Sequence, residues 1–280
     1  MRFIKAVLNF VRIEHTLFSL PLIFGGVFLA SKDIPSPVLL ILILIGSAGA
    51  RTVALTLNRL IDHEIDGRNP RTTNRELPSG RLTVTQAVMI LVMGLAIYLI
   101  SAYLISDFCF YLSPIPLIVF TGYPYLKRLT PLAHFGVGLG LSMAPLGGWF
   151  AVTKSFTPIL PGALLSLVTL LWVTGFDIIY SSLDEEFDRE AKLYSFVVRF
   201  GNVRALQISG YLHLTSYALL VLLFFLYIKA LLGLPFLLLS GYLLYLEHKK
   251  ADDVELAFFR INAAFGFVVF LMIIVGGNWP

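Results

Sequence analysis

Cysteine is almost absent from this sequence of 280 residues, which contains only Cys109. A single cysteine excludes an internal disulfide and a cysteine-based metal site, and the apolar residues on both sides indicate a buried, inert thiol. Charge is also scarce: 14% of the residues are charged, 58% are hydrophobic, and the mean hydropathy is +0.84. This composition excludes an ordinary soluble domain and predicts a membrane protein.

A concentrated basic surface is also lacking, although the formal net charge is +4. Lys and Arg are scattered over short loops, so nucleic acid is not an expected partner, and lipid headgroups and phosphates are. No obligate protein partner is indicated. The first 16 residues carry basic side chains at helical spacing without a small-residue cleavage site, so we predict a retained interfacial helix.

Long apolar runs predict an all-α, polytopic membrane protein with nine transmembrane helices. Several runs approach the roughly 20 residues that a helix needs to cross the hydrocarbon core. The predicted spans are 16–31, 37–60, 84–105, 108–122, 133–152, 158–181, 205–228, 230–246 and 256–276.

The basic residues between these spans predict the orientation of the chain. With a cytoplasmic N-terminus, only Lys32, Lys154 and Lys229 lie in loops on the opposite side, and the other loop Lys and Arg face the cytoplasm. We therefore expect an integral, multi-pass protein of the cell (inner or plasma) membrane. The two long charged connections, 61–83 and 182–204, share the cytoplasmic side, so we expect the functional site there.

Both long connections follow an even-numbered span that ends in a carboxylate cluster. The chain is therefore predicted to be a single membrane domain, residues 1–280, built from two related four-helix halves and a ninth helix. The halves are expected at about 1–130 and 131–250.

The first carboxylate cluster contains Asn58, Asp62 and Asp66. Its spacing of four residues places three oxygen-bearing side chains on one stripe of a helix. Three aligned oxygen ligands favour a divalent cation.

The second cluster contains Asp177, Asp184 and Asp188, with Tyr180 nearby. The spacing of these residues also places them on one face of a helix, so the second cluster is expected to resemble the first. Unpaired carboxylates at the ends of apolar helices repel one another and lose hydration unless cations neutralise them.

Mg²⁺ is the predicted cofactor, since it usually binds a few carboxylates together with phosphate oxygens of the substrate. Two facing clusters thus predict a cradle for a Mg²⁺-bridged diphosphate. The candidate metal ligands are Asn58, Asp62, Asp66, Asp177, Asp184 and Asp188.

Basic side chains near the clusters are expected to bind the diphosphate. Arg71 and Arg75 lie on a loop punctuated by Gly and Pro, which could fold over a phosphate. Lys127 and Arg128 lie at the start of the connection after the fourth span and supply a point charge and a forked donor.

One further charge, Arg51, lies inside an apolar span about two turns before Asn58 and on the same face. A charge within a membrane span is a functional candidate. Arg260 and Asn262 on the last span are left outside the site, because a structural pairing explains them equally well. His15 is kept as a candidate acid or base.

These motifs resemble the UbiA superfamily of intramembrane prenyltransferases along essentially the whole chain. The most specific stretch is NRLIDHEIDGRNPRTTNRELPSG, residues 58–80. The family patterns N-x-x-x-D-x-x-x-D and D-x-x-Y-x-x-x-D-x-x-x-D both match without gaps. Two further features, an Arg seven residues before the Asn and a Y-P-x-x-K-R segment, fall on Arg51 and on residues 123–128.

The resemblance implies nine helices around a central cavity, with the Asp motifs at its cytoplasmic mouth and a lateral opening for an isoprenoid tail. It also implies Mg²⁺-dependent transfer of a polyprenyl group from an allylic prenyl diphosphate to a small aromatic acceptor. Residues 71–80 are similar to the branch that prenylates 4-hydroxybenzoate ortho to its hydroxyl in ubiquinone biosynthesis.

The same resemblance implies a role for each matched residue. The catalytic set is expected to be Asp62, Asp66, Asp184, Asp188, Lys127 and Arg51. The residues expected to bind the diphosphate or the acceptor are Asn58, Arg71, Arg75, Lys127, Arg128, Tyr180, Arg51 and Arg12, with Arg51 or Arg12 facing the acceptor carboxylate.

Two alternatives stay open. The acceptor can instead be a futalosine-derived aromatic or a naphthoate of menaquinone synthesis, or a glycerol ether of archaeal lipids. From another class, a cation or substrate transporter also places Asp within helices, but near the midplane and with broken helices rather than at one end.

Overall fold

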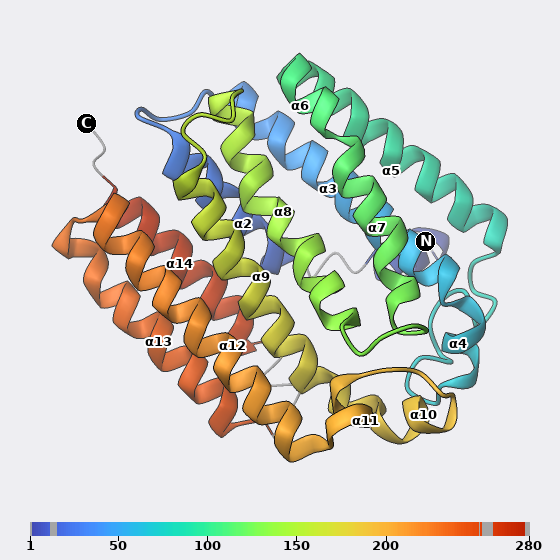
Figure 1. Cartoon of the computed structure of the whole chain (residues 1–280). Coiled ribbons are helices and arrows are strands. Elements are labelled where there is room, and N and C mark those ends of the chain that lie inside the picture. Colours follow the sequence, from blue (N-terminus) through green and yellow to red (C-terminus); the bar gives the residue numbers. More distant parts are fainter. Residues whose placement is uncertain (1, 12–15, 252, 254–259, 278–280) are drawn as a thin grey trace.

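The computed structural model describes residues 2–11, 16–251, 253 and 260–277, and all regular structure in this part of the chain is helical (Figure 1). The helices are α1 (Arg2–Phe10), α2 (Thr16–Ala30), α3 (Pro37–Ile61), α4 (His63–Arg68), α5 (Val84–Ile105), α6 (Asp107–Leu112), α7 (Pro114–Leu126), α8 (Ala133–Thr153), α9 (Leu160–Tyr180), α10 (Glu185–Glu190), α11 (Phe196–Phe200), α12 (Asn202–Leu223), α13 (Leu234–Lys249) and α14 (Asn262–Gly276). Short helical turns are η2 (Ser181–Asp184), η3 (Phe224–Ile228) and η4 (Leu231–Gly233).

The helices agree with the predicted membrane spans. Within the described residues, 7 helical segments are long and apolar enough to cross a membrane, and Leu20–Ala30 and Asn262–Gly276 are shorter apolar helices. Each predicted span corresponds to one of these segments, so the all-α, polytopic prediction is confirmed. The predicted start of the ninth span, residue 256, lies outside the described residues.

The fourth span differs from its prediction as one helix over 108–122. It consists of α6 and α7, which meet at Ser113, because Pro114 at the start of α7 has no N–H with which to continue the preceding helix. The second piece also runs further than predicted, to Leu126, so Tyr123 belongs to a helix rather than to a loop.

Helix α9 lies within the bundle, packed between α8 and α12, and is the most buried of the spanning helices described (Figure 1). On one side of it, α2 packs against α8 and α14, and on the other side of the molecule α3 and α5 form an antiparallel pair. The main apolar core joins α9, α12, α13 and α14 around Trp172, Leu220, Phe265 and Met272. The division into two related halves stays a prediction.

A buried polar network ties the last helices to α9. The Trp172 indole N–H donates to Asn262 Oδ1 at 2.7 Å, and Asn262 Nδ2 lies 2.8 Å from Glu247 Oε1. His213 on α12 completes the link, with Nε2 3.0 Å from the Trp172 carbonyl oxygen. Hydrogen bonds of this kind hold helices together where lipid offers no partner. Asn262 is therefore a structural residue, as the sequence allowed.

Helices α2 and α8 approach so closely that only glycine fits at two positions. A Cβ atom on Gly26 would lie 1.9 Å from the Pro145 carbonyl oxygen, and one on Gly148 would lie 2.2 Å from the Ile23 carbonyl oxygen. Small residues at helix interfaces are typical of membrane bundles because they let backbones pack directly. A Cβ atom added to the neighbouring Gly147 would have no atom within 4 Å and would point into open space.

This difference between adjacent glycines makes a stability prediction. Gly148→Ala forces α2 and α8 apart, so we expect it to lower the midpoint of thermal unfolding of the purified protein in detergent by several degrees. Gly147→Ala adds the same methyl group without a clash, and we expect its midpoint to match the unchanged protein. Equal midpoints for the two variants would show that the α2–α8 contact is looser than described.

Candidate active site

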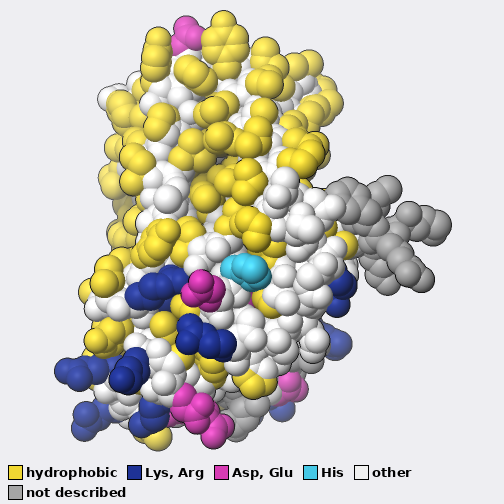
Figure 2. Space-filling model, turned by 90° about the vertical axis from the view of Figure 1, so that its right-hand side faces the viewer, with side chains coloured by type: hydrophobic (Ala, Val, Ile, Leu, Met, Phe, Trp, Pro, Cys, Tyr) yellow, Lys and Arg dark blue, Asp and Glu magenta, His cyan; other side chains and the backbone are white. Residues whose placement is uncertain are grey.

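One end of the bundle carries most of the charge. On the face that Figure 2 shows, apolar side chains cover the upper part, and most of the Lys, Arg, Asp and Glu side chains gather at the lower end. The segments at this end are α4, the loop 69–82, η2, α10 and α11 (Figure 1). Both carboxylate clusters lie there.

The first cluster is centred on Asp62, which is 3% exposed and lies at the junction of α3 and α4. Its Oδ2 accepts hydrogen bonds from Lys127 Nζ at 2.7 Å and from Asn58 Nδ2 at 3.3 Å. Arg128 Nη2 lies 3.1 Å from Oδ1. Burial raises the pKa of the Asp62 carboxyl, and the neighbouring charges of Lys127 and Arg128 oppose that rise.

The predicted stripe of three side chains is interrupted at Asp62. Its dihedral angles, φ −96° and ψ 7°, end α3 and begin the short helix α4. Backbone hydrogen bonds from Asp62 N to Asn58 O and from Asp66 N to Asp62 O still continue the helical pattern. Asp66 therefore stays at the site, where both its oxygens accept from Arg75 Nη1, at 2.9 and 2.8 Å.

The second cluster is joined to the first through the loop 69–82. Asp184 Oδ1 accepts from Asn69 Nδ2 and from Arg71 Nε, each at 2.8 Å. The same Arg71 donates from Nη1 to the Tyr180 hydroxyl at 2.7 Å and lies over its ring. Segments more than 100 residues apart in sequence thus meet in one network of charges.

The three acidic residues of the second cluster lie in three successive helical elements. Asp177 is in α9, which ends at Tyr180, Asp184 ends the tighter turn η2, and Asp188 is in α10. Asp177 instead accepts a hydrogen bond from His134, whose Nδ1 lies 2.7 Å from its Oδ2. Asp188 on α10 makes no ion pair with the described cations.

The premise that these carboxylates lack partners is wrong for Asp62, Asp66 and Asp184, which pair with Lys127, Arg128, Arg75 and Arg71. Among the described residues, no three His, Cys, Asp or Glu side chains are arranged to hold a metal ion. The donor set still suits Mg²⁺: all its ligand atoms are oxygens, and the buried Asp62 Oδ1 accepts no hydrogen bond from the residues that the structure describes. A cation could bind here only if the carboxylates released the basic side chains that now pair with them.

A cavity of about 470 Å³ lies in the apolar part of the bundle, next to the first cluster. It lies among α3, α5, α7 and α8, and nearly all of its lining residues are apolar. Arg51 and Tyr123 line it, and Tyr123 interacts with Asn58 of the first cluster. Since Arg51 lies seven residues before Asn58 on α3, the two are about 10 Å apart along the helix axis.

The far part of this cavity reaches the apolar surface. Its lining residues Ile115, Phe156 and Ile159 are exposed there, and Figure 2 shows the apolar belt hollowed above the charged end. A cavity of this volume is in the range of small-molecule sites. The arrangement therefore places an apolar chamber beside a polar, charge-rich end of the bundle.

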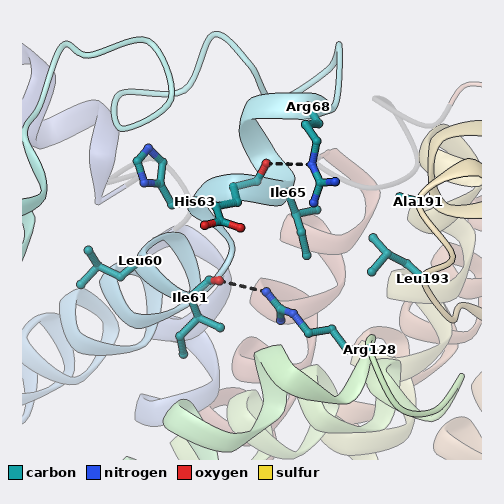
Figure 3. A pocket seen from close by; sticks show the side chains of 9 residues that line it. Leu60, Ile61, His63, Ile65, Arg68, Arg128, Ala191 and Leu193 are labelled. Atoms are coloured by element: carbon teal, nitrogen blue, oxygen red, sulfur yellow. Dashed lines mark hydrogen bonds between the residues drawn. The ribbon is translucent and has the colours of Figure 1, made fainter.

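A second pocket, of about 390 Å³, lies at the same end (Figure 3). Arg68 and Arg128 line it from opposite sides, and Leu193 lies to one side of them. Arg128 donates to the Ile61 carbonyl oxygen at 2.9 Å, so it separates this pocket from the Asp62 carboxylate.

The loop 69–82 is held against α3 by a buried ion pair that no sequence motif indicates. Arg59 Nη1 lies 2.6 Å from Glu76 Oε2, and these side chains are 6% and 8% exposed. The guanidinium also lies over the Phe10 ring, at 4.9 Å from its centroid. This pair places Arg71 and Arg75 over the acidic clusters.

Several expectations have a clear outcome in this geometry. Asn58, Lys127, Arg128, Arg71, Arg75 and Tyr180 lie in the network around the acidic residues, and Arg51 lines the cavity, while their predicted roles in binding substrate stay predictions. Arg12 and His15 lie outside the described residues. His134, Asn69 and Glu76 were missed, since nothing in their local sequence spacing indicates contact with a distant carboxylate or guanidinium.

The ion pair under the loop makes a second prediction. Glu76→Ala leaves Arg59 buried without its carboxylate, which typically costs about 3–5 kcal/mol. We expect a lower midpoint of thermal unfolding and faster proteolytic cleavage within 69–82.

Arg81→Ala is the matched control, because this exposed side chain lies 3.4 Å from the other Glu76 oxygen. Exposed pairs contribute roughly 0–1 kcal/mol, so its midpoint should change little. An Arg81→Ala effect as large as that of Glu76→Ala would contradict the assignment of Arg59 as the main partner.

Comparison with known sequences identifies relatives along most of the chain. The sequence profile of the UbiA prenyltransferase family matches residues 19–263. A 4-hydroxybenzoate octaprenyltransferase of Haemophilus ducreyi is 27% identical over 284 aligned positions, which cover 99% of this chain and 98% of that protein.

Solved structures show the same fold. The apo structure of a UbiA homolog from Aeropyrum pernix K1 superposes with a TM-score of 0.87 and 32% identity, covering 94% of this chain and 98% of that one. A UbiA homolog from Archaeoglobus fulgidus, bound to GPP and Mg²⁺, has a TM-score of 0.69 and 21% identity, covering 97% and 98% of the two chains.

Proposed function

The chain belongs to the UbiA prenyltransferase family and is an integral, multi-pass membrane prenyltransferase, and from this we propose that it transfers a polyprenyl group to 4-hydroxybenzoate. The donor is an allylic prenyl diphosphate, and the new carbon–carbon bond forms ortho to the acceptor hydroxyl. The curated relative from Haemophilus ducreyi, which matches this chain end to end, supports this acceptor. Family membership excludes the transporter alternative.

The observation that carries the proposal is the network of alternating charges at the mouth of an apolar cavity. Each carboxylate of Asp62, Asp66 and Asp184 is paired with a Lys or Arg. A diphosphate with its cation can enter by replacing both partners: the carboxylates turn to the cation, and the basic side chains turn to the phosphate oxygens. The prenyl tail then extends into the chamber lined by α3, α5, α7 and α8.

We propose Mg²⁺ as the cation, held by Asp62, Asp66, Asp184 and Asp188 with support from Asn58 and Asp177. The Archaeoglobus fulgidus homolog bound to GPP and Mg²⁺ supports this choice. When bound, Mg²⁺ supplies Lewis-acid stabilisation of the negative charge on the departing diphosphate.

The basic side chains of this chain stabilise the diphosphate leaving group. Lys127 and Arg128 come from the end of α7, and Arg71 and Arg75 come from the loop 69–82, so the diphosphate is enclosed from two sides. These donors favour the state in which negative charge develops on the bridging oxygen. The allylic carbon then gains carbocation character within the apolar chamber.

Arg51 is the proposed partner of the acceptor carboxylate, because it is a cationic residue lining the apolar cavity close to the Asp motifs. Tyr123, beside Asn58, lies between the chamber and the diphosphate site. The ring carbon ortho to the acceptor hydroxyl attacks the allylic carbon, and loss of the ring proton restores aromaticity. The surplus of loop Lys and Arg on the charged end supports a cytoplasmic location for this mouth and for the N-terminus.

Isosteric substitutions at the two clusters test the diphosphate chemistry. We expect Asp62→Asn and Asp184→Asn to reduce prenyl transfer by about 10²-fold or more, because each removes a charge that the transition state requires. Prenyl transfer is measured in membranes with labelled prenyl diphosphate, 4-hydroxybenzoate and MgCl₂, and excess EDTA should abolish it. Full activity of either folded variant would falsify the assignment.

A panel of acceptors tests the identity of the aromatic substrate. We expect product from 4-hydroxybenzoate and little from a naphthoate, a futalosine-derived aromatic or a glycerol ether, as judged by mass analysis. Arg51→Gln should raise the KM for 4-hydroxybenzoate more than the KM for prenyl diphosphate. Exclusive prenylation of another acceptor would replace the proposed substrate and leave the diphosphate site intact.

Filling the chamber tests the path of the prenyl tail. Gly147 lines the cavity and has free space at its Cβ position, so Gly147→Phe is expected to occupy the chamber without disturbing the helices. Transfer from long-chain prenyl diphosphates should fall, while transfer from a short-chain donor should persist. Loss of both activities to the same extent would place the tail elsewhere.

A further inference from the structure

His134, at the start of α8, is a buried residue in direct contact with an Asp motif, and the proposed chemistry does not use it. It is 6% exposed. Its Nδ1 lies 2.7 Å from Asp177 Oδ2, and the backbone N–H of Phe196 donates to its Nε2 at 3.4 Å. The ring also packs against the Phe196 ring, with centroids 5.7 Å apart. Both ring nitrogens therefore have a specific partner.

The partners of His134 determine where its proton lies. A backbone N–H can only donate, so Nε2 must present a lone pair to Phe196. The ring proton is therefore on Nδ1 and is donated to the Asp177 carboxylate. This tautomer occupies Oδ2 of Asp177 and leaves Oδ1 for another ligand.

The chain next to Phe196 connects His134 to other residues of the site. We call residues 193–196 the strap. The Leu193 N–H donates to the Asp188 carbonyl oxygen at 2.8 Å, and the Tyr194 N–H donates to the Lys127 carbonyl oxygen, also at 2.8 Å. With the bond from Phe196 to His134, the strap holds three residues that belong to α10, the end of α7 and α8.

We propose that His134 is a positioning residue of the diphosphate site: it fixes the orientation of the Asp177 carboxylate, and the strap fixes His134 relative to Lys127 and Asp188. The inference rests on the proposed function, because it assigns Asp177 to the site of the Mg²⁺-diphosphate. Partners that orient a metal-binding carboxylate in this way typically contribute about 10–100-fold in affinity or activity.

Three substitutions separate positioning from packing. Asn places an amide N–H at the same number of bonds from Cα as Nδ1 of His, so His134→Asn keeps the donor to Asp177. His134→Gln has similar volume but places its amide one bond further out, and His134→Ala removes both donor and volume. The readout is the Kd of Mg²⁺ plus inorganic diphosphate, measured by calorimetry on the purified full chain, together with the thermal midpoint.

We expect the Kd to rise about 10–100-fold in His134→Gln and His134→Ala and to stay near that of the unchanged protein in His134→Asn. His213→Asn is the matched control, because His213 is also buried but bonds to Trp172 in the structural network. It should lower the thermal midpoint without changing the Kd.

The positioning role is overturned if His134→Gln and His134→Ala bind with unchanged Kd, or if His134→Asn is weakened as much as His134→Gln. A protein that binds Mg²⁺-diphosphate in this pattern but transfers no prenyl group would keep the role of His134 and overturn the proposed function alone. Failure of the unchanged protein to bind Mg²⁺-diphosphate would overturn both.

Discussion

The pairing of buried carboxylates with Lys and Arg at one end of an apolar bundle is the interaction on which the active site depends. Charges in this position lose hydration, so each must have a partner of opposite sign. Two of the pairs join elements far apart in sequence, Lys127 at the end of α7 with Asp62 and Arg71 in the loop 69–82 with Asp184. These ion pairs therefore also hold the two carboxylate clusters close to each other.

The same pairs explain how the protein can exist without substrate and still admit the proposed Mg²⁺-diphosphate, which carries both positive and negative charge. A Mg²⁺-diphosphate carries both signs, so it can replace a set of ion pairs and leave no buried charge without a partner. The network is polar at the mouth and meets an apolar cavity within about two helical turns, from Asn58 to Arg51. This short distance suits the proposed substrate, whose diphosphate would lie in the first environment and whose isoprenoid tail would lie in the second.

The membrane spans were predicted correctly because hydrophobicity alone decides them. A helix in lipid must be long and must satisfy its own backbone hydrogen bonds, so an apolar run of sufficient length identifies it. The breaks within helices and the contacts between side chains were predicted less well. The division of the fourth span at Ser113 and the change from α9 to the turn η2 after Tyr180 depend on local backbone geometry, which the hydropathy pattern does not report.

The sequence by itself determined the fold class, the two Asp motifs and the basic residues near them, since these follow from hydrophobic run length and from residue spacing. Only the tertiary structure decided which charges meet. The bonds of Arg71 to Asp184, Arg59 to Glu76 and His134 to Asp177 join residues on different segments. A chain in lipid brings such residues together through helix packing, and packing depends on side-chain shape at every interface rather than on any one motif.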